Sequence, residues 1–329
     1  MSEQPGPYAV VTRRVPQEVL DRIERRIPRL RLWEEDVPIP RDTLLEWIPG
    51  ADGLYCLLTD PVDAEVLDAA GPSLKVVSQM AVGYDNIDVA ACTERGIPAG
   101  NTPGVLTETT ADLAVALMLA AARRLCEAAA FVKAGEWVTW RPMELAGYDL
   151  HGSTVGIVGL GRIGKAVARR LRGFDCRLLY HSRQPDPEAA HIGAAYVEFD
   201  TLLGSSDFVT LHVPLTGQTY HLIGAPQLER MKPGAVLVNT ARGPVVDQAA
   251  LLRALRGGQI AAAGLDVTDP EPLPPDHPLL DLPNVVVLPH IGSASIKTRS
   301  RMAEMAADNL LAGLRGERLP NCVNPEVYG

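Results

Sequence analysis

The sequence feature that most constrains this chain is an apolar run that ends in a glycine-rich turn at residues 155–164. The run stops at Gly159, and the spacing that follows is G-x-G-x-x-G across Gly159, Gly161 and Gly164. In a dinucleotide site the first glycine makes a tight turn, the second lets a diphosphate approach the backbone, and the third lets the helix pack on the strand. The N–H groups and the dipole at the start of that helix then face the phosphates.

The residues after this turn separate a cofactor site from an ordinary glycine turn. Ile163, Val167 and Leu171 recur at helical spacing, and Gly173 follows as a stop signal. Residues 176–180 then form a second apolar run that is typical of a strand. Strand, glycine turn, helix and strand together favour a dinucleotide-binding unit over a plain turn.

Further strands are expected on both sides of this unit, with helical stretches between them. The first hundred residues alternate apolar runs at 8–12, 53–59 and 74–78 with helices. From residue 154 onward, further runs occupy 208–213, 235–239, 262–266 and 285–288. This alternation predicts an α/β protein with two domains, each built on a doubly wound, mostly parallel sheet, and the domain with the glycine turn is expected to be a Rossmann cofactor domain.

The domain boundaries follow from loop composition. Residues 100–104 read as a loop, and a long helix from Thr107 to Arg124 follows as the crossing between domains. A last helix begins near Ser295 and can return to the first domain. We therefore predict one domain from residues 1–102 and 295–329, and a second, dinucleotide-binding domain from residues 103–294.

Composition excludes several functional classes. The net charge of −9 over 329 residues argues against a nucleic-acid surface. The five cysteines lack C-x-x-C spacing and no histidines show metal-ligand spacing, so we expect reduced thiols, a cytoplasmic protein and no metal. No signal peptide is visible, and the most apolar helix, residues 113–122, is far shorter than the roughly twenty residues of a membrane span.

Three side chains suited to proton transfer and anion binding come just after apolar strands. Arg242 follows the strand at 235–239, Glu271 follows the strand at 262–266, and His290 follows the strand at 285–288. Each alone has a plain structural interpretation: a helix cap, a solvated charge or a core histidine. Because the carboxyl ends of parallel strands form the ligand edge of such a fold, we expect the three to act together.

With these motifs in place, the sequence resembles the D-2-hydroxyacid dehydrogenase family over nearly its whole length, and within it the glyoxylate/hydroxypyruvate reductases. Residues 81–88, 155–164, 237–246, 261–273 and 288–295 carry the resemblance. It implies that residues 1–102 and 295–329 form a flavodoxin-like substrate-binding domain, and that Arg242, Glu271 and His290 are catalytic. His290 would protonate the substrate oxygen, Glu271 would keep His290 charged, and Arg242 would orient the substrate carboxylate and carbonyl.

The resemblance also implies the residues that surround the substrate and the cofactor. Backbone N–H groups at Val82 and Gly83 would hold the substrate carboxylate, with Ala81 beside them, and Leu58 would be a pocket wall. The cofactor side would comprise the following residues: Gly159, Leu160, Gly161, Arg162, Ile163, Gly164, Ser182, Arg183, His212, Val213, Pro214, Thr240, Ala241, Asp266 and Gly292.

The choice between the two nicotinamide cofactors depends on the end of the second strand of the unit. An NAD site usually places a carboxylate there to bind the ribose hydroxyls. This chain has Ser182 and Arg183 instead, which can hold a 2′-phosphate. We therefore expect a preference for NADPH, with NADH possible; an arginine simply solvated at the surface is the alternative.

Two tryptophans, Trp137 and Trp140, lie in the loop-like segment 134–152. They either pack in the core or belong to an arm that reaches a second subunit. In the reductases that the chain resembles, an aromatic residue at the place of Trp140 caps the partner's substrate pocket, which implies a homodimer.

Two other functions stay open at this point. Within the enzymes, the alternative is another small-acid dehydrogenase of the D-lactate or phosphoglycerate type. From a different class, some relatives are NAD(H)-sensing corepressors that keep the catalytic residues. A substrate panel separates them, because a sensor turns over poorly with every acid.

Overall fold

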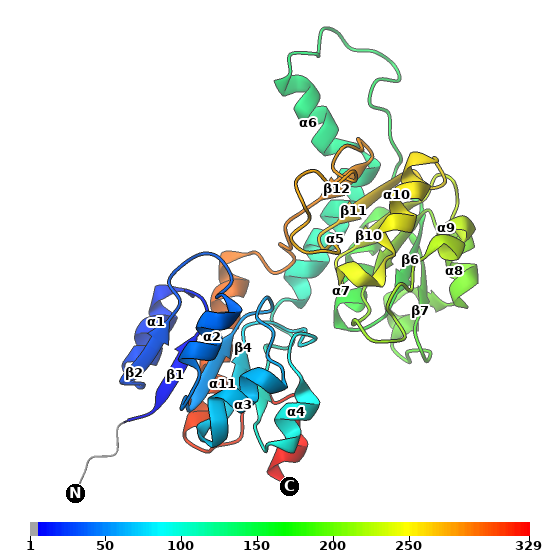
Figure 1. The fold of residues 1–329 in the computed structure, drawn as a ribbon. Coiled ribbons are helices and arrows are strands. Elements are labelled where there is room, and N and C mark those ends of the chain that lie inside the picture. Colours follow the sequence, from blue (N-terminus) through cyan, green and yellow to red (C-terminus); the bar gives the residue numbers. More distant parts are fainter. Residues whose placement is uncertain (1–5) are drawn as a thin grey trace, which may run out of the picture. The chain divides into compact units, whose positions relative to one another are not determined.

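A computed structural model describes residues 6–329, which form two compact units (Figure 1). One unit contains the chain up to Leu106 together with Ser295–Gly329, and the other contains Thr107–Ala294. Each unit has a fully parallel sheet with helices on both faces, so the predicted α/β class is confirmed.

The first unit has a five-stranded sheet in the order β2-β1-β3-β4-β5, the strand order of flavodoxin-like folds. Helices α2, α3 and α4 pack on one face and α1 and α11 on the other. The elements are β1 (Tyr8–Val11), α1 (Gln17–Glu24), β2 (Arg29–Leu32), α2 (Arg41–Trp47), β3 (Gly53–Cys56), α3 (Ala64–Ala70), β4 (Val76–Gln79), α4 (Val89–Glu94), β5 (Ala99–Gly100) and α11 (Ile296–Leu314).

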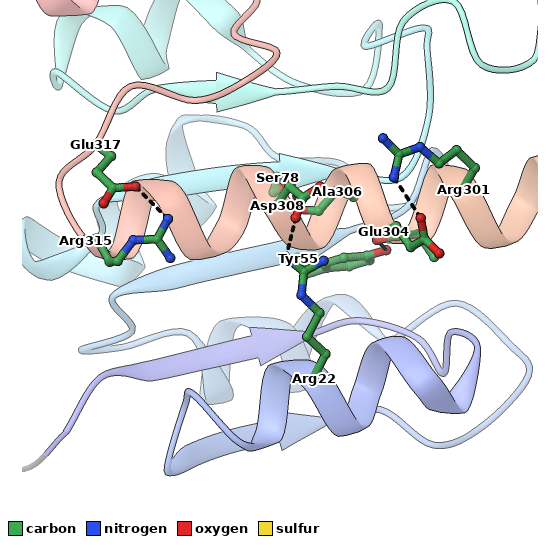
Figure 2. A network of polar contacts seen from close by, with 10 residues as sticks. Arg22, Tyr55, Ser78, Arg301, Glu304, Ala306, Asp308, Arg315 and Glu317 are labelled. Atoms are coloured by element: carbon green, nitrogen blue, oxygen red, sulfur yellow. Dashed lines mark hydrogen bonds and ion pairs between the residues drawn. The ribbon is translucent and has the colours of Figure 1, made fainter.

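Helix α11, the last long helix of the chain, closes this unit by lying directly on β3 and β4. A Cβ atom built on Gly53 would come within 2.7 Å of Leu310, and one on Gly313 within 2.4 Å of Val76. In addition, Tyr55 Oη donates to the carbonyl of Ala303 at 3.2 Å. Ser78 Oγ donates to the carbonyl of Ala306 in α11 at 2.6 Å (Figure 2). The expected return of the C-terminal helix to the first unit is therefore seen, and glycines make the close packing possible.

The second unit has a seven-stranded sheet in the order β12-β11-β10-β9-β6-β7-β8, which contains the Rossmann order. Helices α5 and α7 cover one face and α8, α9 and α10 the other. The elements are α5 (Thr107–Ala122), α6 (Leu125–Lys133), β6 (Thr154–Val158), α7 (Arg162–Leu171), β7 (Arg177–His181), β8 (Ala194–Tyr196), α8 (Phe199–Ser205), β9 (Phe208–Leu211), α9 (Ala225–Arg230), β10 (Val236–Asn239), α10 (Gln248–Arg256), β11 (Ala262–Leu265) and β12 (Val285–Val287).

Three expectations about local structure need correction. The edge strands β2, β5 and β8 are not among the predicted strands, because none is a continuous apolar run of useful length: β2 reads Arg-Leu-Arg-Leu, β5 has two residues and β8 has three. Helix α5 ends before Arg124, whose left-handed backbone (φ 53°) separates α5 from α6. The interpretation that Trp137 and Trp140 pack in the core is wrong, since their exposed fractions are 64% and 78%.

Within residues 6–329, no helix combines the length and the apolar character that crossing a bilayer requires.

Candidate active site

The glycine turn lies where the strand order of the larger sheet reverses, between β6 and β9. Gly159 adopts φ 93°, and a Cβ atom there would come within 2.8 Å of the carbonyl oxygen of His212. A Cβ atom on Gly164 would lie 2.2 Å from the carbonyl oxygen of Gly159. Packing thus requires these two glycines, as the spacing predicts.

Gly161 is different, because a Cβ atom at this position would meet none of the described atoms of its own unit within 4 Å. It is the N-cap of α7, and no side chain caps the helix there. The N–H groups of the first turn therefore have no side-chain cap and lie at the positive end of the helix dipole. Thr240 directly follows β10, at the same edge of the sheet. Its buried Oγ1 has no hydrogen-bond partner among the described residues. These features fit the diphosphate and polar groups of a dinucleotide.

The end of β7 carries no carboxylate. Ser182 is half-buried and its Oγ accepts a long hydrogen bond from Leu160 N at 3.4 Å, while Arg183 is exposed. The next carboxylate, Asp186, is paired with Lys165 at 2.9 Å, and this hydrogen bond lowers the pKa of Asp186. The nearest acidic group is thus already neutralised by a lysine, which leaves the serine and the arginine at the strand end.

His212 follows β9, and its backbone N–H donates to Val158 O at 2.8 Å. Its ring pairs through Nε2 with Thr210 Oγ1 at 2.9 Å, and burial lowers its pKa from 6.5 to about 3. The imidazole is therefore neutral and structural. The buried Nδ1 of the ring has no hydrogen-bond partner among the described residues. A cofactor role for His212, Val213 and Pro214 stays a prediction.

Arg242 is positioned by an asparagine that sequence reasoning did not single out. Asn239 ends β10; its Nδ2 donates to Arg242 O at 2.8 Å and its Oδ1 accepts from Ala241 N at 3.0 Å. The Arg242 guanidinium in turn donates to Ala241 O at 2.8 Å and is half-buried. A buried asparagine at a strand end was the only available signal, and it is a weak one.

The structure brings Glu271 and His290 into direct contact, with 2.6 Å between Glu271 Oε1 and His290 Nδ1. Burial raises the pKa of Glu271, but the hydrogen bond and charge of His290, together with the charge of Arg242, outweigh it and leave the pKa lowered. Glu271 is therefore an ionised partner that fixes the imidazole ring. Nε2 is the His290 nitrogen left to face a substrate.

Asp266, expected on the cofactor side, holds the segment that carries His290. Its carboxylate accepts from the backbone N–H groups of Ile291 and Gly292, each at 2.7 Å, and its carbonyl accepts from His290 N at 2.9 Å. Burial raises the pKa of Asp266. His290 itself has a left-handed backbone (φ 53°), a conformation that non-glycine residues rarely adopt. The hydrogen bonds to Asp266 stabilise this conformation.

The expected substrate residues lie in the smaller unit. Residues 81–83 follow β4 and Leu58 follows β3, both at the carboxyl edge of the five-stranded sheet. Leu58 is 37% exposed, and its place as a pocket wall stays a prediction. Among the residues from 6 to 329, no cluster of His, Cys, Asp and Glu side chains is arranged to hold a metal ion.

Comparison with known proteins identifies the family. The model described as "D-isomer specific 2-hydroxyacid dehydrogenase, NAD binding domain" matches residues 115–292. This chain belongs to the D-isomer specific 2-hydroxyacid dehydrogenases. The predicted family is thus confirmed.

Several similar proteins have more specific names. Glyoxylate reductase of Korarchaeum cryptofilum is 57% identical over 98% of this chain and 97% of its own. Human glyoxylate reductase/hydroxypyruvate reductase is 52% identical over 94% of this chain and 96% of its own. The crystal structure of an NADPH-dependent glyoxylate/hydroxypyruvate reductase from Sinorhizobium meliloti, in complex with NADP and malonate, superposes with a TM-score of 0.83 at 36% identity, covering 97% of each chain.

Proposed function

We propose that the protein reduces small 2-oxo acids, converting glyoxylate to glycolate and hydroxypyruvate to D-glycerate. The observation that carries the proposal is the 2.6 Å contact between His290 and Glu271 at the sheet edge that also bears the dinucleotide turn. The names of relatives about half identical to this chain support the same substrates.

The proposed roles follow from which atoms are already engaged. When bound, the reduced nicotinamide supplies a hydride for the carbonyl carbon of the substrate. His290 donates a proton from Nε2 to the carbonyl oxygen, because its Nδ1 is held by Glu271. Glu271 keeps its negative charge beside the ring throughout. Arg242 binds the substrate carboxylate and carbonyl oxygen with its forked donors.

Each unit is assigned one binding task. We assign the dinucleotide to residues 103–294, through the turn at 159–164, the strand ends near Thr240 and the loop at Gly292. We assign the substrate carboxylate to residues 1–102 and 295–329, through the backbone at 81–83 with Leu58 as a wall. The open space above Gly161 and the partnerless Thr240 hydroxyl support the first assignment.

A preference for NADPH over NADH is proposed from the end of β7. Ser182 and Arg183 offer a hydroxyl and a forked cation to a 2′-phosphate, and Asp186 is occupied by Lys165. No carboxylate of the described chain at this strand end competes for the ribose hydroxyls. NADH would bind without the phosphate contacts and therefore more weakly.

A homodimer is proposed from the segment around α6. This helix and the loop after it extend away from the rest of the larger unit (Figure 1). They expose large apolar side chains, with exposed fractions of 53% for Val132, 64% for Trp137 and 78% for both Trp140 and Met143. A second subunit would bury this surface, and Trp140 would then reach the partner's substrate pocket. Light scattering that found only monomer at micromolar concentration would contradict the dimer.

The experiment that tests the function is a steady-state panel of 2-oxo acids with both cofactors, followed by the absorbance of the reduced nicotinamide. Glyoxylate and hydroxypyruvate should give the highest kcat/KM, and NADPH should exceed NADH. Highest activity with pyruvate would favour a D-lactate type enzyme. Negligible turnover with every acid would favour a sensor that binds cofactor without catalysis.

A further inference from the structure

Three successive carbonyl groups of the loop after β4 are held by hydrogen bonds. Three successive carbonyls accept hydrogen bonds from the same unit: Ala81 O from the backbone of Thr102 at 2.9 Å, Val82 O from Asn101 Nδ2 at 2.8 Å, and Gly83 O from Gln79 Nε2. Two of these three donors are side-chain amides. The direction of each peptide unit in the loop is therefore fixed by a separate contact.

The fixed carbonyls determine where the N–H groups point. A trans peptide is planar, and its N–H lies opposite its C=O. The carbonyls of residues 81, 82 and 83 share peptide planes with the N–H groups of residues 82, 83 and 84. Those three N–H groups therefore point away from the buried amides. Within the described chain, the N–H groups of Val82 and Gly83 bond to no acceptor.

Both side-chain amides are built into the interior of the smaller unit. Gln79 is the last residue of β4 and has no exposed surface, and Asn101 is 8% exposed. Asn101 is itself tied to α11, because the fully buried Asn309 donates to Asn101 O at 3.0 Å. The opposite side of the Asn309 amide accepts from Asn321 N at 3.0 Å. A continuous set of buried hydrogen bonds thus connects α11 with the loop.

From this arrangement we propose that Gln79 and Asn101 are positioning residues for substrate binding. Asn101 holds the Val82 carbonyl and thereby directs the N–H of Gly83, and Gln79 holds the Gly83 carbonyl and thereby directs the N–H of Tyr84. These successive N–H groups, next to that of Val82, present a preformed cradle to the carboxylate of a 2-oxo acid. This inference rests on the proposed function, which places the substrate carboxylate at this loop. Because the loop is already ordered before the substrate binds, binding does not carry the entropy cost of ordering the loop.

The test removes the donors and keeps the size of the side chains, with Gln79→Met and Asn101→Leu. Asn324→Leu is the matched control, because Asn324 is fully buried in the same unit and bonds Ile97 O at 3.0 Å and Ala99 N at 2.8 Å, away from the loop. Each of the two loop variants should raise KM for glyoxylate about tenfold or more. Their kcat and their KM for NADPH should change little, because the lost contact orients the ground-state carboxylate.

Hydrogen–deuterium exchange of residues 80–86 gives a readout that does not depend on activity. Both loop variants should exchange faster there, while the control should not. If either apolar variant does not fold, Gln79→Glu and Asn101→Asp remove the same donors at nearly constant shape.

Unchanged glyoxylate KM in folded loop variants, or an equal rise in the Asn324 control, would overturn the inference. If the unaltered protein reduces no 2-oxo acid, the proposed function fails by itself. Exchange then decides the positioning role: faster exchange confined to the loop supports it, and unchanged exchange overturns it.

Discussion

Replacing Gly161 by Ala should weaken cofactor binding with almost no effect on the fold. The added Cβ atom would meet none of the described atoms of the larger unit within 4 Å, and the backbone φ of −75° suits any residue. The free energy of unfolding should therefore fall by no more than about 1 kcal/mol, the usual scale for an N-cap change. The methyl group would instead occupy the space through which a diphosphate reaches the backbone.

The size of the binding loss can be worked out from the contact removed. A hydrogen bond to a charged group contributes about 1.5–3 kcal/mol, which corresponds to about a ten- to hundredfold rise in the NADPH dissociation constant. Fluorescence titration measures that constant, and thermal unfolding checks the fold.

Two further glycines of this region supply controls. Gly173 lies just beyond the other end of α7, and a Cβ atom there would also meet none of the described atoms of its unit within 4 Å. Gly173→Ala should therefore change neither the free energy of unfolding nor the NADPH dissociation constant. Gly164→Ala should destabilise the protein by about 3 kcal/mol or more, because its Cβ atom would lie 2.2 Å from Gly159 O. If Gly161→Ala binds NADPH as tightly as the Gly173 control, the assignment of the diphosphate to this turn is refuted.

Three other predictions test separate parts of the site. His290→Ala should lower kcat about 10²- to 10⁴-fold while the NADPH dissociation constant is retained; near-normal turnover would exclude its role as proton donor. Arg183→Ala should lower kcat/KM with NADPH about tenfold or more and leave NADH kinetics nearly unchanged, whereas equal losses would argue against a 2′-phosphate contact. Because the pKa of folded His212 is lowered from 6.5 to about 3, the unfolded chain binds more protons between these values. Stability should therefore fall as the pH drops below 6.5, by at most about 1.4 kcal/mol per pH unit from this residue. His212→Gln should flatten that dependence in denaturant titrations at several pH values, and an identical pH dependence would contradict it.

The parts of the site that the sequence predicts are those that lie at strand ends. Arg242, Glu271 and His290 each follow an apolar run, and parallel strands deliver their carboxyl ends to one edge. The contact of Glu271 with His290 therefore follows from the pattern of strands, even though the residues are far apart in sequence. The glycine spacing predicts the turn, because few residues other than glycine allow other atoms to come so close to the backbone.

The parts that could not be predicted depend on neighbours that only the fold supplies. Asn239, Gln79 and Asn101 are ordinary polar residues until the carbonyls that they bind come within reach. The exposure of the tryptophans in the 134–152 segment could not be predicted either. A loop has no periodic pattern of apolar residues that would show which side chains are buried. Edge strand β2 escapes detection since only one of its sides is paired.

The central claim is that the protein transfers a hydride from the nicotinamide to the carbonyl carbon of a 2-oxo acid. The most direct measurement uses NADPH that carries deuterium at the transferable C4 position, with glyoxylate as substrate and mass spectrometry of the product. Our account predicts glycolate with deuterium bound to its hydroxyl-bearing carbon, and loss of that product in His290→Ala. Glycolate without deuterium, or cofactor that stays reduced in the presence of every 2-oxo acid, would contradict it.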